Sequence, residues 1–215
     1  MTAIKMLKLD YLTMKPHLRT FSFMVLFVMI FLSVGSSITL ILINISWYIA
    51  LVAANIFAVE EKHNMGRLYG TLALNLRSIV LGRYLFILSL YLVTLCSVII
   101  FVGLIPSLFP LSGNPLIIEH FLLSTSLSFL IFSLIVSGQL PLYFKMGYNK
   151  ARIMSIIPFL FLFGLAALIN YIDPLGVLNK VLSNEMGFSI FFFFCGIVVM
   201  MASYMVSLKI KNKQK

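Results

Sequence analysis

The chain has 215 residues, of which 61% are apolar and 14% aromatic, whereas only 10% are charged. Soluble domains usually contain about 45–50% apolar and about 25% charged residues, so this composition excludes an ordinary soluble protein and indicates an integral membrane protein. The formal net charge of +10 would suit nucleic-acid binding, but the basic residues flank apolar runs as they do in membrane proteins, and we expect no nucleic-acid partner.

Residues 1–17 combine apolar and basic side chains. The apolar residues recur at helical spacing with lysines between them: Ile4, Leu7, Tyr11 and Met14. This pattern is typical of a helix that lies in the plane of the membrane interface. We therefore expect an interfacial helix that ends or changes direction at Pro16.

Six mainly apolar runs follow, uncharged apart from Arg19 at the start of the first, and each is long enough to cross a hydrocarbon core of about 30 Å as a helix. They are residues 18–35, 38–59, 84–105, 120–140, 153–172 and 187–208. We expect the first run to remain as an uncleaved helix and the first turn to fall near residues 33–37, with 44–46 as the competing position. The sequence thus predicts an all-α integral membrane protein with six transmembrane helices, in which residues 1–215 form a single domain.

The basic residues give the expected orientation. All of the 16 Lys and Arg residues except Lys180 lie in segments that six crossings place on one side of the membrane. Because Lys and Arg concentrate on the cytoplasmic side, both termini, the 60–83 loop and the 209–215 tail are predicted to be cytoplasmic.

Motifs for catalysis by the chain itself are missing from the sequence. A phosphate-binding loop needs a Gly-Lys pair, and the sequence contains none; the HExxH zinc motif and the GxSxG nucleophile motif are also absent. The histidines, His17, His63 and His120, fall in separate segments. We therefore expect no catalytic residue, no metal site and no cofactor bound by this chain.

Glu60 and Glu61, followed by Lys62 and His63, leave an enzymatic alternative. Paired acids resemble the double-Glu motif of membrane-embedded prenyl-protein-type proteases, which activate water inside the membrane. Here Lys62 and the aqueous loop adjoin the pair, which favours a solvated helix end. An intramembrane protease that uses Glu60 and Glu61, and a non-catalytic membrane scaffold or immunity protein, are the alternatives.

Uncharged polar residues form stripes along two of the predicted spans. They are Asn44, Tyr48 and Asn55 on the second span and Ser126, Ser133 and Ser137 on the fourth. Such stripes either join helices or line a substrate path, and both interpretations stay open. Because no charge lies at mid-depth in any span, an ion-coupled carrier is disfavoured and the energy for transport should come from a partner.

The predicted cytoplasmic loop, residues 60–83, has a helical pattern of its own. Leu68, Leu72, Leu76 and Ile79 recur on one face, which predicts a short amphipathic helix parallel to the membrane. A cytoplasmic partner could hold such a helix.

Two segments resemble the type-2 ABC transporter permeases (ABC-2 membrane subunits) of Gram-positive bacteria. The first runs from Glu60-Glu61-Lys62 through Arg67-Leu68-Tyr69 to Arg77-Ser78-Ile79-Val80-Leu81-Gly82-Arg83-Tyr84-Leu85. The second, a predicted loop interrupted by Pro141 and Gly147, is Gln139-Leu140-Pro141-Leu142-Tyr143-Phe144-Lys145-Met146-Gly147-Tyr148 followed by Ala151-Arg152. The second is similar in particular to the phenol-soluble-modulin exporter permeases.

The resemblance implies a multi-pass protein of the bacterial plasma membrane that exports amphipathic or hydrophobic peptides. It would pair with a second permease, as a homodimer or a paralogous heterodimer, and dock a separate ATPase subunit that binds ATP and Mg²⁺. The residues implied in ATPase coupling are Glu60, Glu61, Arg67, Tyr69, Leu72, Asn75, Arg77, Ser78, Arg83, Tyr143, Lys145 and Arg152. The polar stripes would then be candidates for the substrate path.

Overall fold

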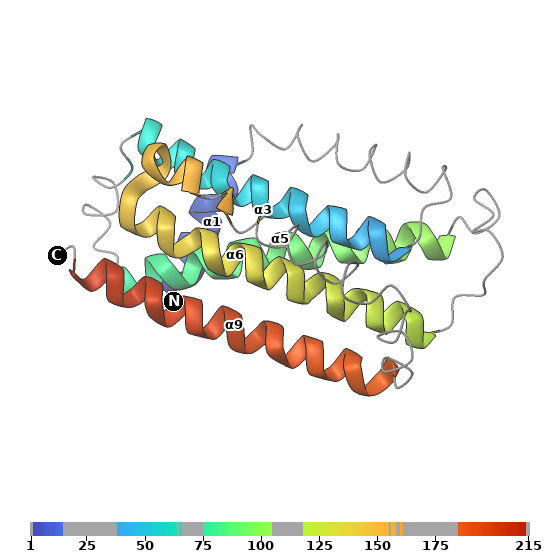
Figure 1. Cartoon of the computed structure of the whole chain (residues 1–215). Coiled ribbons are helices and arrows are strands. Elements are labelled where there is room, and N and C mark those ends of the chain that lie inside the picture. The colour runs from blue at the N-terminus through green and yellow to red at the C-terminus, as the bar shows by residue number, and fades with distance from the viewer. Residues whose placement is uncertain are drawn as a thin grey trace.

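The computed structural model describes residues 2–14, 38–63, 65, 75–104, 118–154, 156–157, 160 and 185–213. Within these residues the chain forms long helices (Figure 1): α1 (Thr2–Met14), α3 (Ile38–Lys62), α5 (Leu76–Leu104), α6 (Ile118–Met154) and α9 (Glu185–Lys213). The fold of the described part is therefore all-helical, as the sequence predicts.

Four helices in the described part are long and apolar enough to cross a membrane: Thr39–Lys62, Leu76–Ile100, Phe121–Ala151 and Met186–Lys213. They correspond to the second, third, fourth and sixth predicted spans. The first predicted span, 18–35, lies outside the described residues, and so does nearly all of the fifth, 153–172.

The helices extend beyond the bounds predicted from the apolar runs. The competing turn at 44–46 is wrong, because those residues lie inside α3. α5 begins at Leu76, so the end predicted for the 60–83 loop falls within a helix. α6 continues through the predicted loop to Met154 and contains Pro141, with the break confined to Gly147. The predicted bounds assume that charges lie outside helices, whereas Arg83 is compensated by acidic side chains and stays within α5.

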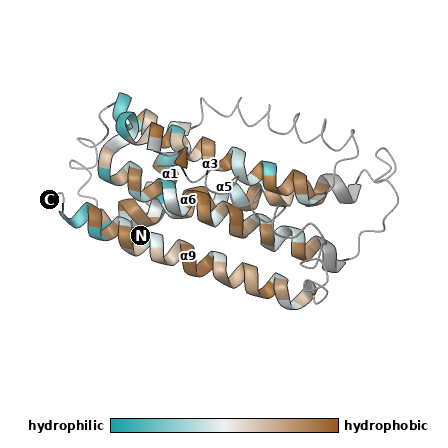
Figure 2. Ribbon diagram, viewed as in Figure 1, coloured by the Kyte–Doolittle hydropathy of each residue, from teal (hydrophilic) through white to brown (hydrophobic). Residues whose placement is uncertain are grey.

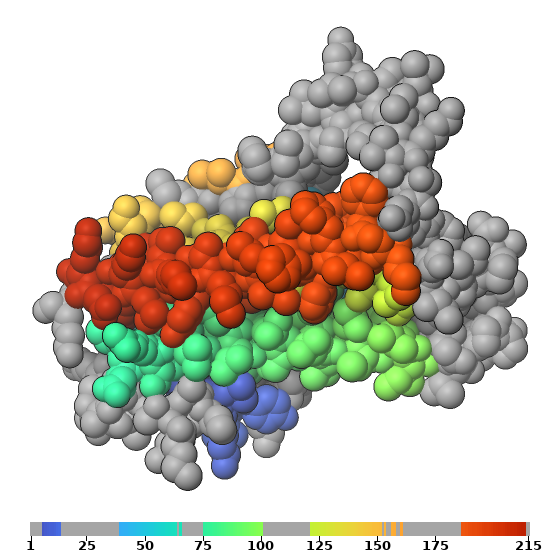
Figure 3. All heavy atoms as spheres, turned by 90° about the horizontal axis from the view of Figure 1, so that it is seen from below, coloured from blue at the N-terminus to red at the C-terminus, as the bar shows by residue number. Residues whose placement is uncertain are grey.

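The helices pack side by side. α6 contacts α3 and α9, while α5 contacts α1, α3 and α9. Seen from below, α9 lies alongside α5 (Figure 3). α3 and α6 end, and α5 begins, at the same end of the bundle (Figure 1). The chain order thus brings segments 60–63, 76–83 and 145–154 together at one end.

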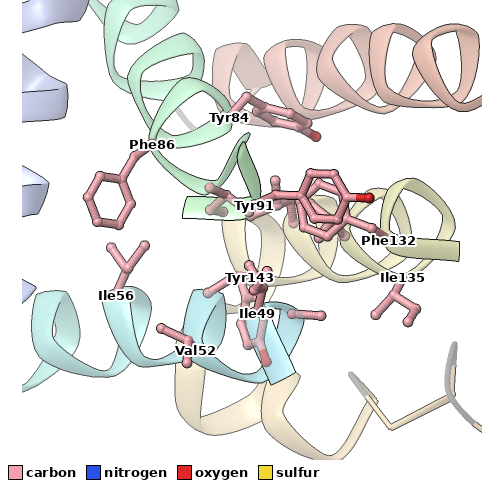
Figure 4. Packing of buried hydrophobic residues seen from close by; sticks show 14 of the residues in the cluster. Ile49, Val52, Ile56, Tyr84, Phe86, Tyr91, Phe132, Ile135 and Tyr143 are labelled. Atoms are coloured by element: carbon pink, nitrogen blue, oxygen red, sulfur yellow. The ribbon is translucent and has the colours of Figure 1, made fainter. Parts of the chain in front are cut away.

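The core between α3, α5 and α6 is aliphatic and aromatic (Figure 4). Tyr91 stacks on Phe132, with ring centroids 4.4 Å apart, and Ile49 is fully buried. α9 approaches α6 closely at Gly196, where a Cβ atom would lie only 2.8 Å from Phe129 Cδ1. Small residues at contacts allow this close packing in membrane proteins, where apolar surface alone does not drive helices together.

Hydroxyl groups join the helices within this apolar packing. Ser46 Oγ lies 2.7 Å from Ser128 Oγ, which joins α3 to α6. Tyr84 Oη lies 2.7 Å from Ser203 Oγ and 2.9 Å from Ser207 Oγ, which joins α5 to α9. Buried polar side chains of this kind hold transmembrane helices in register.

Candidate functional site

Hydrophilic residues gather at the end of the bundle where α3 ends and α5 begins (Figure 2). We call this region the polar end and define it by Asp10, Glu60, Glu61, Arg83 and residues 147–150. It contains two sets of interactions, one centred on Arg83 and one on Glu61.

Arg83 of α5 is held between two carboxylates. Its Nε lies 3.1 Å from Asp10 Oδ2 of α1, and its Nη2 lies 3.0 Å from Glu60 Oε2 of α3. The guanidinium carbon also lies 4.7 Å from the centre of the Phe57 ring, which stacks on Tyr143 of α6. Arg83 is only 1% exposed, and a buried charge requires such compensation. One side chain thus connects α1, α3 and α5.

Asp10 is as buried as Arg83, at 1% exposed, whereas Glu60 is 25% exposed. Burial raises the pKa of Asp10 from its ordinary value of 3.8 to about 6, although the neighbouring Arg83 charge lowers it and the Glu60 charge raises it further. Desolvation therefore outweighs the ion pair. Asp10 changes its charge in mildly acidic solution.

Glu61 binds the second part of α6. Its Oε2 accepts hydrogen bonds from the backbone N–H groups of Tyr148, at 2.7 Å, and Asn149, at 3.1 Å. Its Oε1 accepts a bond from Asn149 Nδ2 at 2.6 Å. We call this set of three bonds the Glu61 clasp. It joins the end of α3 to α6.

The clasp depends on a backbone break at Gly147. This residue has φ 73° and ψ 174°, so it interrupts the helical hydrogen bonding of α6. Such a conformation is essentially restricted to glycine. The helix resumes after Gly147, and its first N–H groups, which lack acceptors within the helix, point at Glu61.

A comparison with protein families finds that the model for ABC-2 family transporter proteins matches residues 5–212. The chain belongs to the ABC-2 transporter family. It is therefore a multi-pass membrane protein of the permease type, and ABC-2 membrane subunits generally work with an ATPase partner. The comparisons with curated proteins and with solved structures give no match.

The residues that the resemblance assigns to ATPase coupling differ in their surroundings. Glu60, Arg83 and Tyr143 make internal contacts at the polar end, as Glu61 does in the clasp, and their contact with an ATPase stays a prediction. Asn75, Arg77 and Lys145 are exposed, and Ser78 is half-buried. Arg152 lies within α6. The other residues lie outside the described part of the chain: Arg67, Tyr69 and Leu72.

The start of α5 shows why Asn75 and Arg77 are accessible. The carbonyl of Asn75 accepts hydrogen bonds from the N–H groups of Ser78 and Ile79, which begins the helix. Ile79 is buried against Met6 of α1. The apolar side of this first turn thus packs on the protein, while Arg77 points outward.

The serines of the predicted substrate path in this ABC-2 protein are satisfied by bonds within α6 or to α9. Ser126 and Ser133 are buried and donate to carbonyls of their own helix, those of Leu123 and Phe129. Ser137 donates to the Val199 carbonyl of α9 at 3.4 Å. The burial of Ser126 and Ser133, together with the bond from Ser137 to α9, favours helix packing for the stripe on α6.

The stripe on α3 has a different environment. Asn44, Tyr48 and Asn55 are half-buried, and Asn44 Nδ2 donates to the Leu40 carbonyl within α3. These three residues remain the candidates for a polar wall.

Sequence reasoning missed Asp10 and the partners of Glu61. Asp10 is the only acidic residue among 1–17, and a single acid in a basic segment could have indicated an internal partner. Tyr148 and Asn149 donate to Glu61 through backbone N–H groups, which no residue type reveals, and Asn149 donates through its side-chain amide as well. Among the described residues, no group of three or more His, Cys, Asp or Glu side chains could hold a metal ion.

Proposed function

We propose that this ABC-2 protein is the transmembrane subunit of an ATP-driven exporter that is energised by a separate ATPase subunit. The observation that carries the proposal is the polar end, where ends of α1, α3, α5 and α6 are joined by Arg83 and Glu61. A force applied to the exposed residues Asn75 and Arg77 would therefore reach several spans together. The ATPase would supply the binding sites for ATP and Mg²⁺.

The proposed topology is six spans with both termini in the cytoplasm of a bacterial cell. It is supported by the distribution of Lys and Arg. The polar end then faces the cytoplasm, where an ATPase is accessible. A second permease, identical or paralogous, would complete the path.

The proposed cargo is an amphipathic or hydrophobic peptide. Away from the polar end, α3 presents half-buried Asn44, Tyr48 and Asn55 among apolar side chains. Uncharged polar groups of this kind suit a substrate with both apolar and polar faces better than they suit an ion.

The protein itself is proposed to have no enzymatic activity. Glu60 is paired with Arg83, and Glu61 accepts three hydrogen bonds from α6. A carboxylate that activates water must be within hydrogen-bond reach of that water. These contacts instead support structural roles for both acids.

Purification of the tagged chain from native membranes tests the proposal. We expect vanadate-sensitive ATP hydrolysis to co-purify with it, together with a subunit whose sequence contains a phosphate-binding loop. A preparation without ATP hydrolysis that cleaves a membrane peptide, and loses this activity on Glu61→Gln, would instead establish the protease. A preparation with neither activity would favour a scaffold.

A further inference from the structure

The Glu61 clasp joins two segments that are far apart in the chain and lie in different helices. Glu61 is in the last turn of α3, and its three bonds reach Tyr148 and Asn149 of α6. Both oxygens of the carboxylate are used. The clasp thus specifies the direction as well as the position of the segment it holds.

The held segment, residues 148–154, does not take its direction from a continuous helix with the rest of α6. Gly147 breaks the helical path of α6 immediately before it. The N–H groups at the start of a helix carry partial positive charge and need acceptors, and a carboxylate there is stabilising. In most helices a preceding residue supplies that acceptor. Here the acceptor comes from α3.

The environment of Gly147 fits this arrangement closely. A Cβ atom at this position would lie 3.3 Å from Glu61 Oε2, so the glycine leaves space for the carboxylate as well as adopting the required backbone angles. Glu61, Asn149 and Lys150 are exposed. The clasp is therefore outside the packed core and can be altered without opening a cavity.

We propose that Glu61 is a positioning residue: it fixes the 148–154 segment against the end of α3, so that the two segments form one rigid surface for the ATPase. The use of this surface rests on the proposed function, whereas the clasp itself can be measured without any partner. Arg83 anchors the same end of α3 through Glu60. Motion of the 148–154 segment would therefore be passed to α3 and α5.

The test uses spin labels at Lys62 and Lys150, both exposed, in the full chain after replacement of Cys96 and Cys195. Glu61→Ala removes the acceptor. Asn149→Asp places a second carboxylate where Asn149 Nδ2 now donates. The double variant Glu61→Gln/Asn149→Asp reverses donor and acceptor, because the new amide at position 61 can donate to the new carboxylate at position 149 while the amide oxygen accepts from the backbone.

We expect a narrow distance distribution in the wild type, a broad one in each single variant, and a narrow one again in the double variant. Asn212→Asp, the same change at an exposed position of α9, is the control and should leave the distribution narrow. A purely local loss of folding would not be restored by the exchange. An unchanged distribution in both single variants would overturn the clasp.

The second measurement is vanadate-sensitive ATP hydrolysis that co-purifies with each variant. It should fall about three- to tenfold in Glu61→Ala and Asn149→Asp and recover in the double variant, as expected for the net loss of one intramolecular hydrogen bond. A broadened distribution with unchanged co-purifying hydrolysis would overturn the positioning role. If no ATPase co-purifies with the wild type, the proposed function is wrong. The distance distributions between the labels still test the clasp in that case.

Discussion

Asp10 and Arg83 form an ion pair between two side chains that are each 1% exposed, with Asp10 Oδ2 and Arg83 Nε 3.1 Å apart. The pair lies at the contact of α1 with α5, and Glu60, the second carboxylate beside Arg83, is partly open to solvent. α1 is therefore an integral part of the polar end. A helix that lay at the membrane surface without packing on the rest of the protein would expose Asp10.

The docking of α1 should tighten on acidification. Burial raises the pKa of Asp10 to about 6 from 3.8, so docked α1 binds a proton more tightly than released α1, and docking gains stability as the pH falls from above 6 towards 4. Between pH 7 and pH 5 the gain should be about tenfold. Hydrogen exchange of the α1 amides, corrected for the intrinsic rate at each pH, measures this gain in docking stability.

Asp10→Asn supplies the control for this pH effect. The neutral side chain keeps the size of Asp10, so the pH dependence should vanish and α1 should stay protected at pH 7. Loss of protection on acidification in the wild type, or the same dependence in Asp10→Asn, would contradict the account.

Arg83→Met should destabilise the protein strongly. The change leaves the buried Asp10 and the partly buried Glu60 without a counter-ion, and breaking a buried pair on one side costs about 3–5 kcal/mol. The melting temperature of the purified protein in detergent measures the loss. The triple variant Arg83→Met/Asp10→Asn/Glu60→Gln removes all three charges and should recover most of the lost melting temperature. Equal melting temperatures of the wild type and Arg83→Met would exclude a stabilising cluster.

The spans and the polar end were not equally predictable from sequence. Apolar runs locate α3, α6 and α9, because length and hydropathy suffice for that purpose. They place the start of α5 too late, because a charge such as Arg83 can enter a helix once Asp10 and Glu60 compensate it. The pairing of Arg83 with Asp10 and Glu60 is a tertiary contact, and so is the capping of Tyr148 and Asn149 by Glu61. Neither contact can be predicted from apolar runs or residue spacing.

Gly147→Ala should weaken the clasp. An alanine at φ 73° and ψ 174° is strained by about 1–3 kcal/mol, and its Cβ would lie 3.3 Å from Glu61 Oε2. We expect a lower melting temperature and a broader distance distribution between labels at Lys62 and Lys150. Gly138→Ala, in the regular part of α6, is the comparison, and equal effects of the two changes would argue against a special role for Gly147.

Arg77→Glu should weaken assembly with the ATPase without impairing insertion. Arg77 is exposed at the start of α5, and reversal of a charge in a desolvated contact costs about 2–5 kcal/mol, which is a tenfold loss or more. Co-purifying ATP hydrolysis should fall while the amount of protein in the membrane is maintained. Lys213→Glu, at the end of α9, should change neither the hydrolysis nor the amount of protein. Unaltered hydrolysis in Arg77→Glu would exclude Arg77 from the contact and leave the Lys145 and 148–154 region as the ATPase surface.

Cysteine labelling of intact cells tests the proposed orientation. In a chain without Cys96 and Cys195, single cysteines at Asn114 and Asn184 should react with an impermeant reagent from outside. A cysteine at Gln214 should react only after permeabilisation, because the basic tail is predicted to be cytoplasmic. Reaction at Gln214 in intact cells would reverse the topology.

The most direct test of the central claim is ATP-driven peptide uptake into inside-out vesicles prepared from native membranes, with a fluorescein-labelled amphipathic helical peptide as the probe. The account predicts uptake that requires ATP, is blocked by vanadate, disappears when the protein is deleted and returns with the wild-type chain but not with Arg77→Glu. Uptake that is the same with and without ATP, or with and without the protein, would contradict it.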